Sequence, residues 1–202
     1  MNYKIISSGS SGNCVIINDV MVDCGVPFYK IKEELYGIKY LIITHVHSDH
    51  LNKITYQRIL RNFPLIKVIG NYEVKQTVFI HIVANAGFEI ATDDYIFTPF
   101  ECLHDVLTYG FTWEYEGKKI IYCTDTASLE HAPDLKYDYL FIESNHDEYK
   151  LNEARNEYKG AYNPYLSGKR HLSTQAAKAF YYLHRNSAES EFIELHKSKR
   201  FY

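Results

Sequence analysis

The stretch from Tyr40 to Asn52 constrains the fold and the chemistry of this chain more than any other. It opens with a short apolar run, residues 40–44, whose β-branched side chains predict a buried strand. The strand leads directly into His-Val-His-Ser-Asp-His at positions 45–50. Imidazole and carboxylate groups are ligands of zinc and related divalent metals, and their density at the end of a strand predicts a metal site.

The spacing within this run predicts two neighbouring ions. Side chains at i and i+2 of an extended chain point the same way, so His45 and His47 can share one ion. The chain then turns, and Asp49 and His50 face a different direction that favours a second ion. Asn52 is the expected N-cap of the following helix, which fixes the turn.

Length and composition predict a single globular α/β domain over residues 1–202. The chain has 202 residues, 46% of them hydrophobic and 23% charged, which is ordinary for a globular domain that buries a large core. No internal repeat or linker divides it.

Charge and cysteine content bear on partners and location. The net charge of -3 means that the molecule as a whole lacks the positive charge typical of nucleic-acid-binding proteins. Three cations near the C-terminus, Lys197, Lys199 and Arg200, nevertheless form a local basic group. No signal peptide or segment of membrane-spanning length is expected. The cysteines at 14, 24, 102 and 123 form no CxxC pair, which favours a reducing cytoplasm.

Periodicity and turn residues predict an alternation of strands and helices. Strands are expected at 3–6, 14–18, 20–23, 40–44, 65–69, 95–102, 108–115, 118–123, 137–142 and 191–195. Helices are expected at 27–36, 53–62, 71–86, 147–159 and 173–184, and an irregular loop at 160–170. His81 falls inside the third helix and is expected to be a packed or surface side chain. The pattern predicts two mixed sheets packed face to face with helices outside.

Ligand-type residues recur directly after the predicted strands. They stand at positions 45–50, 104, 125, 143 and 196. A sheet can gather a site along one edge from such strand ends. Asp23, after another strand, is expected either to orient a ligand histidine or to cap a turn. The Ser7–Asn13 loop exposes backbone amides that can approach an anion, or is a plain connection.

This arrangement resembles the metallo-β-lactamase-fold hydrolases. The HxHxDH run, His104, the Thr-Asp-Thr at Asp125 and a late histidine carry the resemblance over essentially the whole chain. It implies the metallo-β-lactamase-like αβ/βα sandwich, an α/β fold of two mixed β-sheets with helices on the outer faces.

Two branches of that superfamily are similar in more detail. Ser8–Cys14, the Glu143–Asp147 segment and His171-Leu-Ser resemble the YycJ-like branch of DNA-degrading exonucleases. The His171-Leu-Ser-Thr-Gln run and the last eight residues resemble ribonuclease Z. These likenesses imply phosphodiester substrates, although the tRNA-gripping arm of ribonuclease Z has no counterpart here.

The resemblance implies a two-metal site, with zinc expected and manganese as the alternative. It assigns His45, His47 and His104 to the first ion, Asp49, His50 and His196 to the second, and Asp125 to both. His171 and His196 compete for the last ligand position. His196 is favoured because it follows a strand directly, which leaves His171 as a catalytic residue paired with Glu143.

The implied reaction is phosphodiester hydrolysis by a hydroxide held between two ions. Asp49 would orient the hydroxide, and His171, kept protonated by Glu143, would protonate the leaving oxygen. The expected partner is nucleic acid or a nucleotide, with no membrane. A second copy of the chain is a further possible partner, because a homodimer could complete the pocket.

Three functions other than a nuclease are compatible with the same residues. A phosphodiesterase of small or cyclic nucleotides fits a compact chain without strand-gripping additions. A thioesterase or lactonase of the same fold is a different enzyme class. A metal-stabilised binding protein would keep the site without activity.

Overall fold

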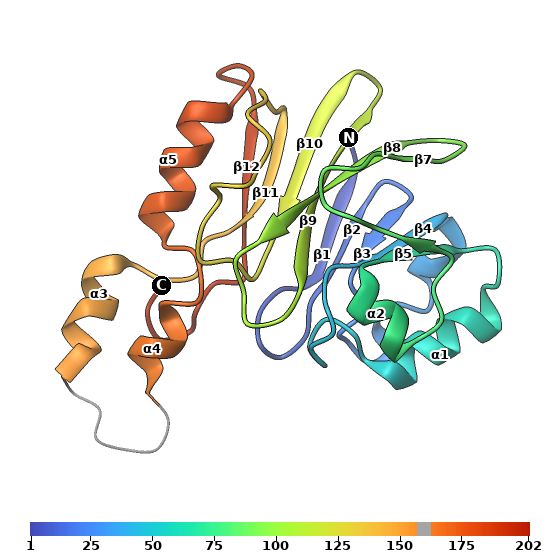
Figure 1. The fold of residues 1–202 in the computed structure, drawn as a ribbon, viewed down its shortest axis with the longest axis horizontal. Coiled ribbons are helices and arrows are strands. Elements are labelled where there is room, and N and C mark those ends of the chain that lie inside the picture. Colours follow the sequence, from blue (N-terminus) through green and yellow to red (C-terminus); the bar gives the residue numbers. More distant parts are fainter. Residues whose placement is uncertain (157–162) are drawn as a thin grey trace. The chain divides into compact units, whose positions relative to one another are not determined.

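The structure, a computed structural model, describes residues 1–156 and 163–202. The chain divides into two compact units, Met1–Asn85 and Ala86–Tyr202. Each unit contains a six-stranded mixed sheet and helices, which confirms the predicted α/β class with two mixed sheets (Figure 1). The single domain remains a prediction. Within the described residues, no helix has both the length and the apolar character needed to cross a membrane.

The sheet of the first unit has the strand order β1-β2-β3-β4-β5-β6. The first three strands pair antiparallel, and β3 to β6 pair parallel. Parallel strands end at one edge, so the segments after β3, β4 and β5 share that edge. The strands are β1 (Tyr3–Ser7), β2 (Cys14–Ile17), β3 (Val20–Val22), β4 (Tyr40–Ile43), β5 (Lys67–Gly70) and β6 (Ile82–Val83).

Two helices cover one face of this sheet. Tyr56 and Ile59 of α1 (Lys53–Asn62) and Val74 of α2 (Tyr72–Thr77) join the same buried core as Leu41 of β4. The Asn52 side chain accepts a hydrogen bond from Thr55 N at 3.1 Å, which confirms the predicted N-cap of α1.

Two predicted helices of this unit are wrong. The helix expected over 71–86 ends at Thr77, because the β-branched and aromatic run that follows favours an extended chain and pairs as β6 with β5. His81 therefore lies in a connection, where its Nδ1 accepts from Val68 N at 3.0 Å. The helix over 27–36 is replaced by two short 3-10 helices, η1 (Phe28–Lys30) and η2 (Glu34–Gly37), neither of which has a side-chain N-cap.

The sheet of the second unit has the order β12-β11-β10-β9-β8-β7. Strands β7 to β10 pair antiparallel, and β10 to β12 pair parallel, so β8, β10, β11 and β12 run in one direction. The strands are β7 (Ile90–Ala91), β8 (Ile96–Cys102), β9 (Thr108–Tyr115), β10 (Lys118–Cys123), β11 (Tyr139–Glu143) and β12 (Glu191–Leu195). The predicted hairpin at 108–123 is confirmed.

One long helix packs on this sheet. Ala177 and Phe180 of α5 (Thr174–His184) share a buried core with alternate residues of β10 and β11, among them Ile121 and Leu140 (Figure 1). Ser173 caps the helix by accepting from Ala176 N at 3.0 Å, as predicted.

A smaller set of helices lies near the C-terminus. The helix expected over 147–159 is α3 (Glu148–Glu153), followed by η3 (Ala154–Asn156), and its residues 157–159 lie outside the described part. The predicted loop at 160–170 contains a short helix, α4 (Pro164–Gly168). Asn163 accepts hydrogen bonds from two amides of its first turn, and Pro164 fits that turn, so local capping starts a helix there.

A close backbone approach in the first unit gives a direct test of the fold. A Cβ at Gly25 would lie 1.7 Å from Asp49 O and 2.8 Å from His50 N. Gly25→Ala must therefore displace the loop that carries both ligand-type side chains, and we expect it to lower the free energy of unfolding by about 1–3 kcal/mol. Urea denaturation would measure this loss.

The matched control is Gly37→Ala, because a Cβ at Gly37 meets nothing within 4 Å. Its effect should stay within about 0.5 kcal/mol. Equal stabilities of the two variants would contradict the close approach at Gly25.

Candidate functional site

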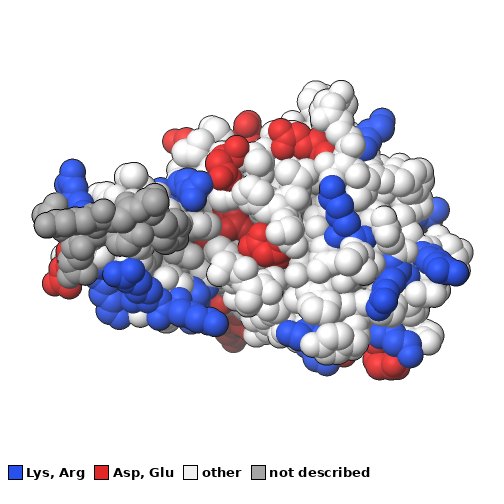
Figure 2. Space-filling model, turned by 90° about the horizontal axis from the view of Figure 1, so that it is seen from below, with Lys and Arg blue, Asp and Glu red and all other residues white. Residues whose placement is uncertain are grey.

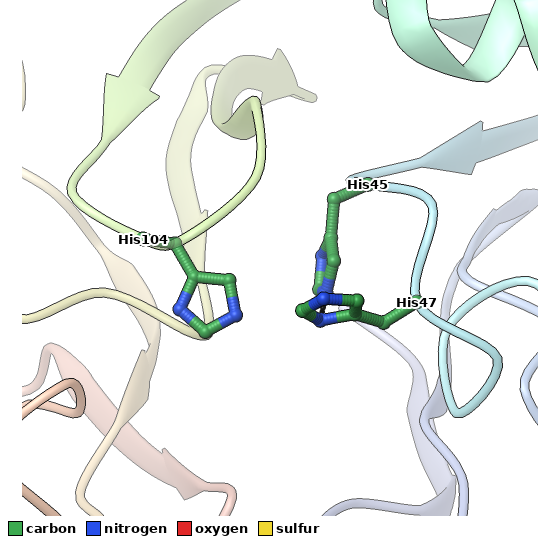
Figure 3. Close-up of side chains that lie close together, drawn as sticks. All are labelled: His45, His47 and His104. Carbon is green, nitrogen blue, oxygen red and sulfur yellow. Dashed lines mark hydrogen bonds between the residues drawn. The ribbon is translucent and has the colours of Figure 1, made fainter. Parts of the chain in front are cut away.

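Three histidines gather at the carboxyl end of β4 in the first unit. His45 Nε2 lies 3.1 Å from His47 Nδ1, and the ring centroids of His45 and His50 are 4.0 Å apart. His45 and His50 are fully buried. Figure 3 shows His45 and His47 on the loop that follows β4. The run predicted from the sequence therefore does form a compact group of imidazoles.

Asp23 anchors this group from the end of β3. Its fully buried carboxylate accepts from Thr44 N at 2.9 Å, from Thr44 Oγ1, and from His50 Nδ1 at 2.6 Å. Burial raises the pKa of Asp23, while the hydrogen bonds from His50 and Thr44 oppose that rise. The donation from Nδ1 sets the tautomer of His50 and turns the lone pair of Nε2 away from Asp23. Of the two roles expected of Asp23, the geometry favours the orientation of His50, whose role as a metal ligand stays a prediction.

Asn13 approaches the other ring nitrogen of His50, a contact that the sequence did not predict. Asn13 Oδ1 accepts from Gly9 N at 2.7 Å, so its Nδ2 faces His50 Nε2 at 2.8 Å. Asn13 Nδ2 also lies 3.2 Å from Gly9 O and 3.3 Å from Asp49 O. Metal binding by His50 Nε2 requires this amide to move, and those two carbonyls offer it other acceptors.

The second unit gathers a cluster of two carboxylates and two imidazoles. Asp125, Glu143, His171 and His196 each place one ligand atom within 4.8 Å of the others. The strands β10, β11 and β12 are parallel, so the residues that follow them meet at one edge of the sheet. The predicted collection of polar residues at strand ends is thus present in this unit.

Glu143 is the common acceptor of the cluster. Its Oε1 accepts from His171 Nδ1 at 2.7 Å and lies 2.8 Å from His196 Nδ1. Its Oε2 accepts from the backbone amides of Thr126 at 2.9 Å and Leu172 at 3.3 Å. The side chain is fully buried. Burial alone would raise its pKa, but the two imidazoles outweigh burial and lower it.

The same carboxylates hold protons on the two imidazoles. Burial disfavours a charged His171, but hydrogen bonds to Asp125 and Glu143 dominate and raise its pKa to about 10. Burial also opposes charge on His196, and Asp125 and Glu143 again raise its pKa. His171 is the more exposed, with 16% of its side chain accessible against 6% for His196. His171 can therefore carry a proton at neutral pH to a bound molecule.

The backbone is strained at three of these residues. Asp23, Asp125 and His196 have φ values of 62°, 52° and 52°, in the left-handed region. Each such residue costs on the order of 1–3 kcal/mol, and Asp and His are among the types that tolerate it best. The left-handed conformation changes the direction of the backbone, and so of the side chain, at the end of a strand.

His104 lies beside this cluster. It follows β8, as Figure 3 shows, and its ring centroid is 5.8 Å from that of His171. Its Nε2 is 3.0 Å from Asp105 Oδ1, and Asp105 accepts from Arg170 at 2.8 Å. Asn145, another residue not predicted, donates to His196 O at 2.8 Å.

The residues present fit divalent metal ions. Each unit offers nitrogen and oxygen donors of the kind that hold zinc or manganese, and the four ligand atoms of the second unit are close enough for a cation to replace the protons they share. The assignment of individual ligands remains a prediction, as does that of Asp49, which has a side chain 29% accessible on the same loop as His50.

The family follows from comparison with known proteins. Residues 19–151, more than half of the chain, match the family described as the beta-lactamase superfamily domain. The chain therefore belongs to the beta-lactamase superfamily, as the resemblance of its motifs predicted. No curated protein matches the sequence.

Solved structures show the same fold at low sequence identity. The human short-form tRNase Z has a TM-score of 0.75 and 16% identity, covering 99% of this chain and 94% of its own. The metallo-beta-lactamase fold protein YhfI from Bacillus subtilis has a TM-score of 0.68 and 15% identity, and the match covers 97% of this chain and 85% of YhfI. A diphosphatase of the PhnP family has a TM-score of 0.64 and 16% identity, and the match covers 98% of this chain and 87% of the diphosphatase.

The raised pKa of His171 predicts how the stability of the metal-free protein depends on pH. Its pKa is about 10 in the folded chain and about 6.5 in the unfolded chain. The folded state holds this proton more tightly, so the stabilisation is complete below pH of about 6.5 and is lost as the pH rises toward about 10. In the presence of EDTA, the urea midpoint should fall over this range more for the wild type than for His171→Gln.

His131→Gln is the control, because 51% of the His131 side chain is accessible in the same unit. The urea midpoint of His131→Gln should change with pH as that of the wild type does. Parallel curves for the wild type and His171→Gln would contradict the raised pKa.

Proposed function

We propose that this protein is a dinuclear metal-dependent phosphodiesterase that hydrolyses nucleic acid. The observation that carries the proposal is the buried Glu143 carboxylate, whose Oε1 lies 2.7 Å from His171 Nδ1 and 2.8 Å from His196 Nδ1. This contact favours a protonated His171. Family membership and the ligand-type clusters support a metal-dependent hydrolase. The similar structures named as a tRNase and a diphosphatase support phosphate chemistry.

The proposed ligands are those predicted from the sequence. One ion would be held by His45, His47 and His104 and a second by Asp49, His50 and His196, and Asp125 would contribute to both. Zinc is the proposed metal and manganese the alternative. When bound, such ions lower the pKa of water to around 7 and neutralise charge on the phosphate.

The residues of the chain then move and hold protons. Asp49 orients the attacking water by accepting a hydrogen bond, and the water oxygen forms a bond to phosphorus as the bond to the leaving oxygen breaks. His171 donates its proton to that leaving oxygen, and the proton lost by the attacking water passes to solvent. His171 then regains a proton from solvent, because the Glu143 carboxylate stabilises its charged form. His196 shares Glu143 but is more buried, which supports the role of ligand for His196 and of acid for His171.

Two other substrates remain as alternatives. A small or cyclic nucleotide would use the same residues. A thioester or lactone would need a weaker general acid than a phosphodiester with a poor leaving group needs. Comparing oligonucleotide, cyclic nucleotide and thioester substrates separates them. The YycJ-like branch, the single domain, a homodimer and a cytoplasmic location also remain proposals.

Activity and metal content of single variants test these roles. His47→Ala and Asp125→Asn should lose metal and all measurable hydrolysis. His171→Ala should keep its metal and lose roughly 10²–10⁴ in kcat on an alkyl diester, the usual contribution of a general acid. With bis(p-nitrophenyl) phosphate the loss should be much smaller, because nitrophenolate leaves without a proton.

His131→Ala is the control and should match the wild type in both assays. Elemental analysis separates the two histidine roles: His196→Ala should lose an ion. Loss of an ion from His171→Ala instead would reverse the roles of His171 and His196.

A further inference from the structure

Exposed cations crowd three segments of the second unit, although the whole chain has a net charge of -3. The segments are α3 with η3, α4 with the two residues that follow it, and the C-terminal residues after β12. Figure 2 shows Lys and Arg side chains gathered over the part that holds α3 and α4 in Figure 1. The exposed cations, here called the basic surface, are Lys150, Arg155, Lys169, Arg170, Lys197, Lys199 and Arg200.

A small core holds these segments together. Leu151 and Ala154 pack with Phe201 and Tyr165. A Cβ at Gly168 would lie 2.6 Å from Leu151 Cδ1, so α4 approaches α3 closely. The cations are therefore held on one packed scaffold.

Most of the positive charge on this surface is not neutralised. Arg155, Lys169, Lys199 and Arg200 form no ion pair with any residue in 1–156 or 163–202. Two cations of the surface are paired, Lys197 with Glu194 and Arg170 with Asp105. Among the acidic groups of α3 and its cap, Asp147 accepts from the first amides of the helix, Glu148 accepts from Ser173, and Glu153 is exposed. The four cations without an ion pair are therefore the ones that can attract an anion.

Aromatic rings lie among the cations. Tyr149 is 77% exposed and Tyr202 is 41% exposed. Lys197 Nζ is 4.2 Å from the ring centroid of Tyr202, and Arg155 and Lys169 lie 5.6 and 5.8 Å from that of Tyr165. Cations for phosphates combined with exposed rings for bases are typical of surfaces that bind single-stranded nucleic acid.

The segments that carry the basic surface adjoin the histidine cluster. Arg170 directly precedes His171, and Lys197 directly follows His196. Asn145 ties the two together, because its side chain donates to His196 O at 2.8 Å and its carbonyl accepts from Ser198 N at 2.8 Å. A chain lying on the surface leads to the proposed proton donor.

We propose that the basic surface binds the backbone and bases of a single-stranded nucleic acid whose scissile phosphodiester lies at the His171–Glu143–His196 cluster. This rests on the proposed function for the location of cleavage, and it makes a polymer the substrate in place of a cyclic nucleotide. The strand binds through cations and rings outside the cluster, so binding can be measured without turnover.

Two triple variants of equal charge test the surface. Lys169→Ala/Lys199→Ala/Arg200→Ala removes unpaired cations of the basic surface. Lys30→Ala/Arg61→Ala/Lys75→Ala removes the same residue types from exposed positions of the first unit. Binding of fluorescein-labelled oligothymidylate of about 20 nucleotides is followed by anisotropy in EDTA, where no hydrolysis occurs.

The surface variant should raise Kd about tenfold or more and reduce the slope of log Kd against log salt by about 2, since each phosphate contact in a single strand contributes about 0.7. Tyr149→Ala should raise Kd about fivefold or more without changing that slope, because stacking releases no counterions. The control triple variant should match the wild type.

Hydrolysis separates this inference from the proposed function. With its metals bound, the surface variant should have a raised KM for the oligonucleotide and an unchanged kcat/KM for bis(p-nitrophenyl) phosphate. Equal oligonucleotide binding by both triple variants would overturn the proposal that the basic surface binds the strand. Binding to phosphatidylserine vesicles but not to the oligonucleotide would also overturn it. Absence of diester hydrolysis by the wild type would overturn the proposed function alone.

Discussion

A buried carboxylate in each unit organises the histidines of that unit. Asp23 and Glu143 are both fully buried, and each is compensated by backbone amides together with imidazole nitrogens. A buried charge without such partners is severely destabilising, so the partners and the carboxylate must be in place together. Folding and the orientation of the site are therefore the same event: the hydrogen bonds that satisfy the carboxylate also fix the tautomer and the direction of the rings.

The fold supplies these groups by ending strands in a sharply turned backbone. In the second unit the residues after β8, β10, β11 and β12 meet at one edge of the sheet, and Asp125 and His196 adopt left-handed conformations there. The two imidazoles that share the Glu143 carboxylate differ in burial, because they lie on different secondary-structure elements. His196 follows a strand and is more buried, whereas His171 precedes a capped helix and is more exposed. That difference is the physical basis for assigning one as ligand and the other as acid.

Much of the fold could be predicted where local patterns agree with tertiary structure. The strand before His45, the hairpin at 108–123, and the helices capped by Asn52 and Ser173 are such cases. The helix expected over 71–86 failed because the parallel pairing of β6 with β5 is a long-range interaction that overrides local periodicity. The contact between Asn13 and His50 joins residues 37 positions apart, and no local signal reports it. The residues of ligand type that gather in each unit could be identified from the sequence, but the sharing of Glu143 by two histidines required coordinates.

The central claim is that Glu143 serves one histidine that binds metal and one that carries a proton. A crystal structure of the protein grown with zinc, with anomalous diffraction recorded at the zinc edge, tests it most directly. We expect two anomalous peaks, with His196 among the ligands of one and His171 among the ligands of neither. A peak coordinated by His171, or the absence of zinc at both histidine groups, would contradict this account.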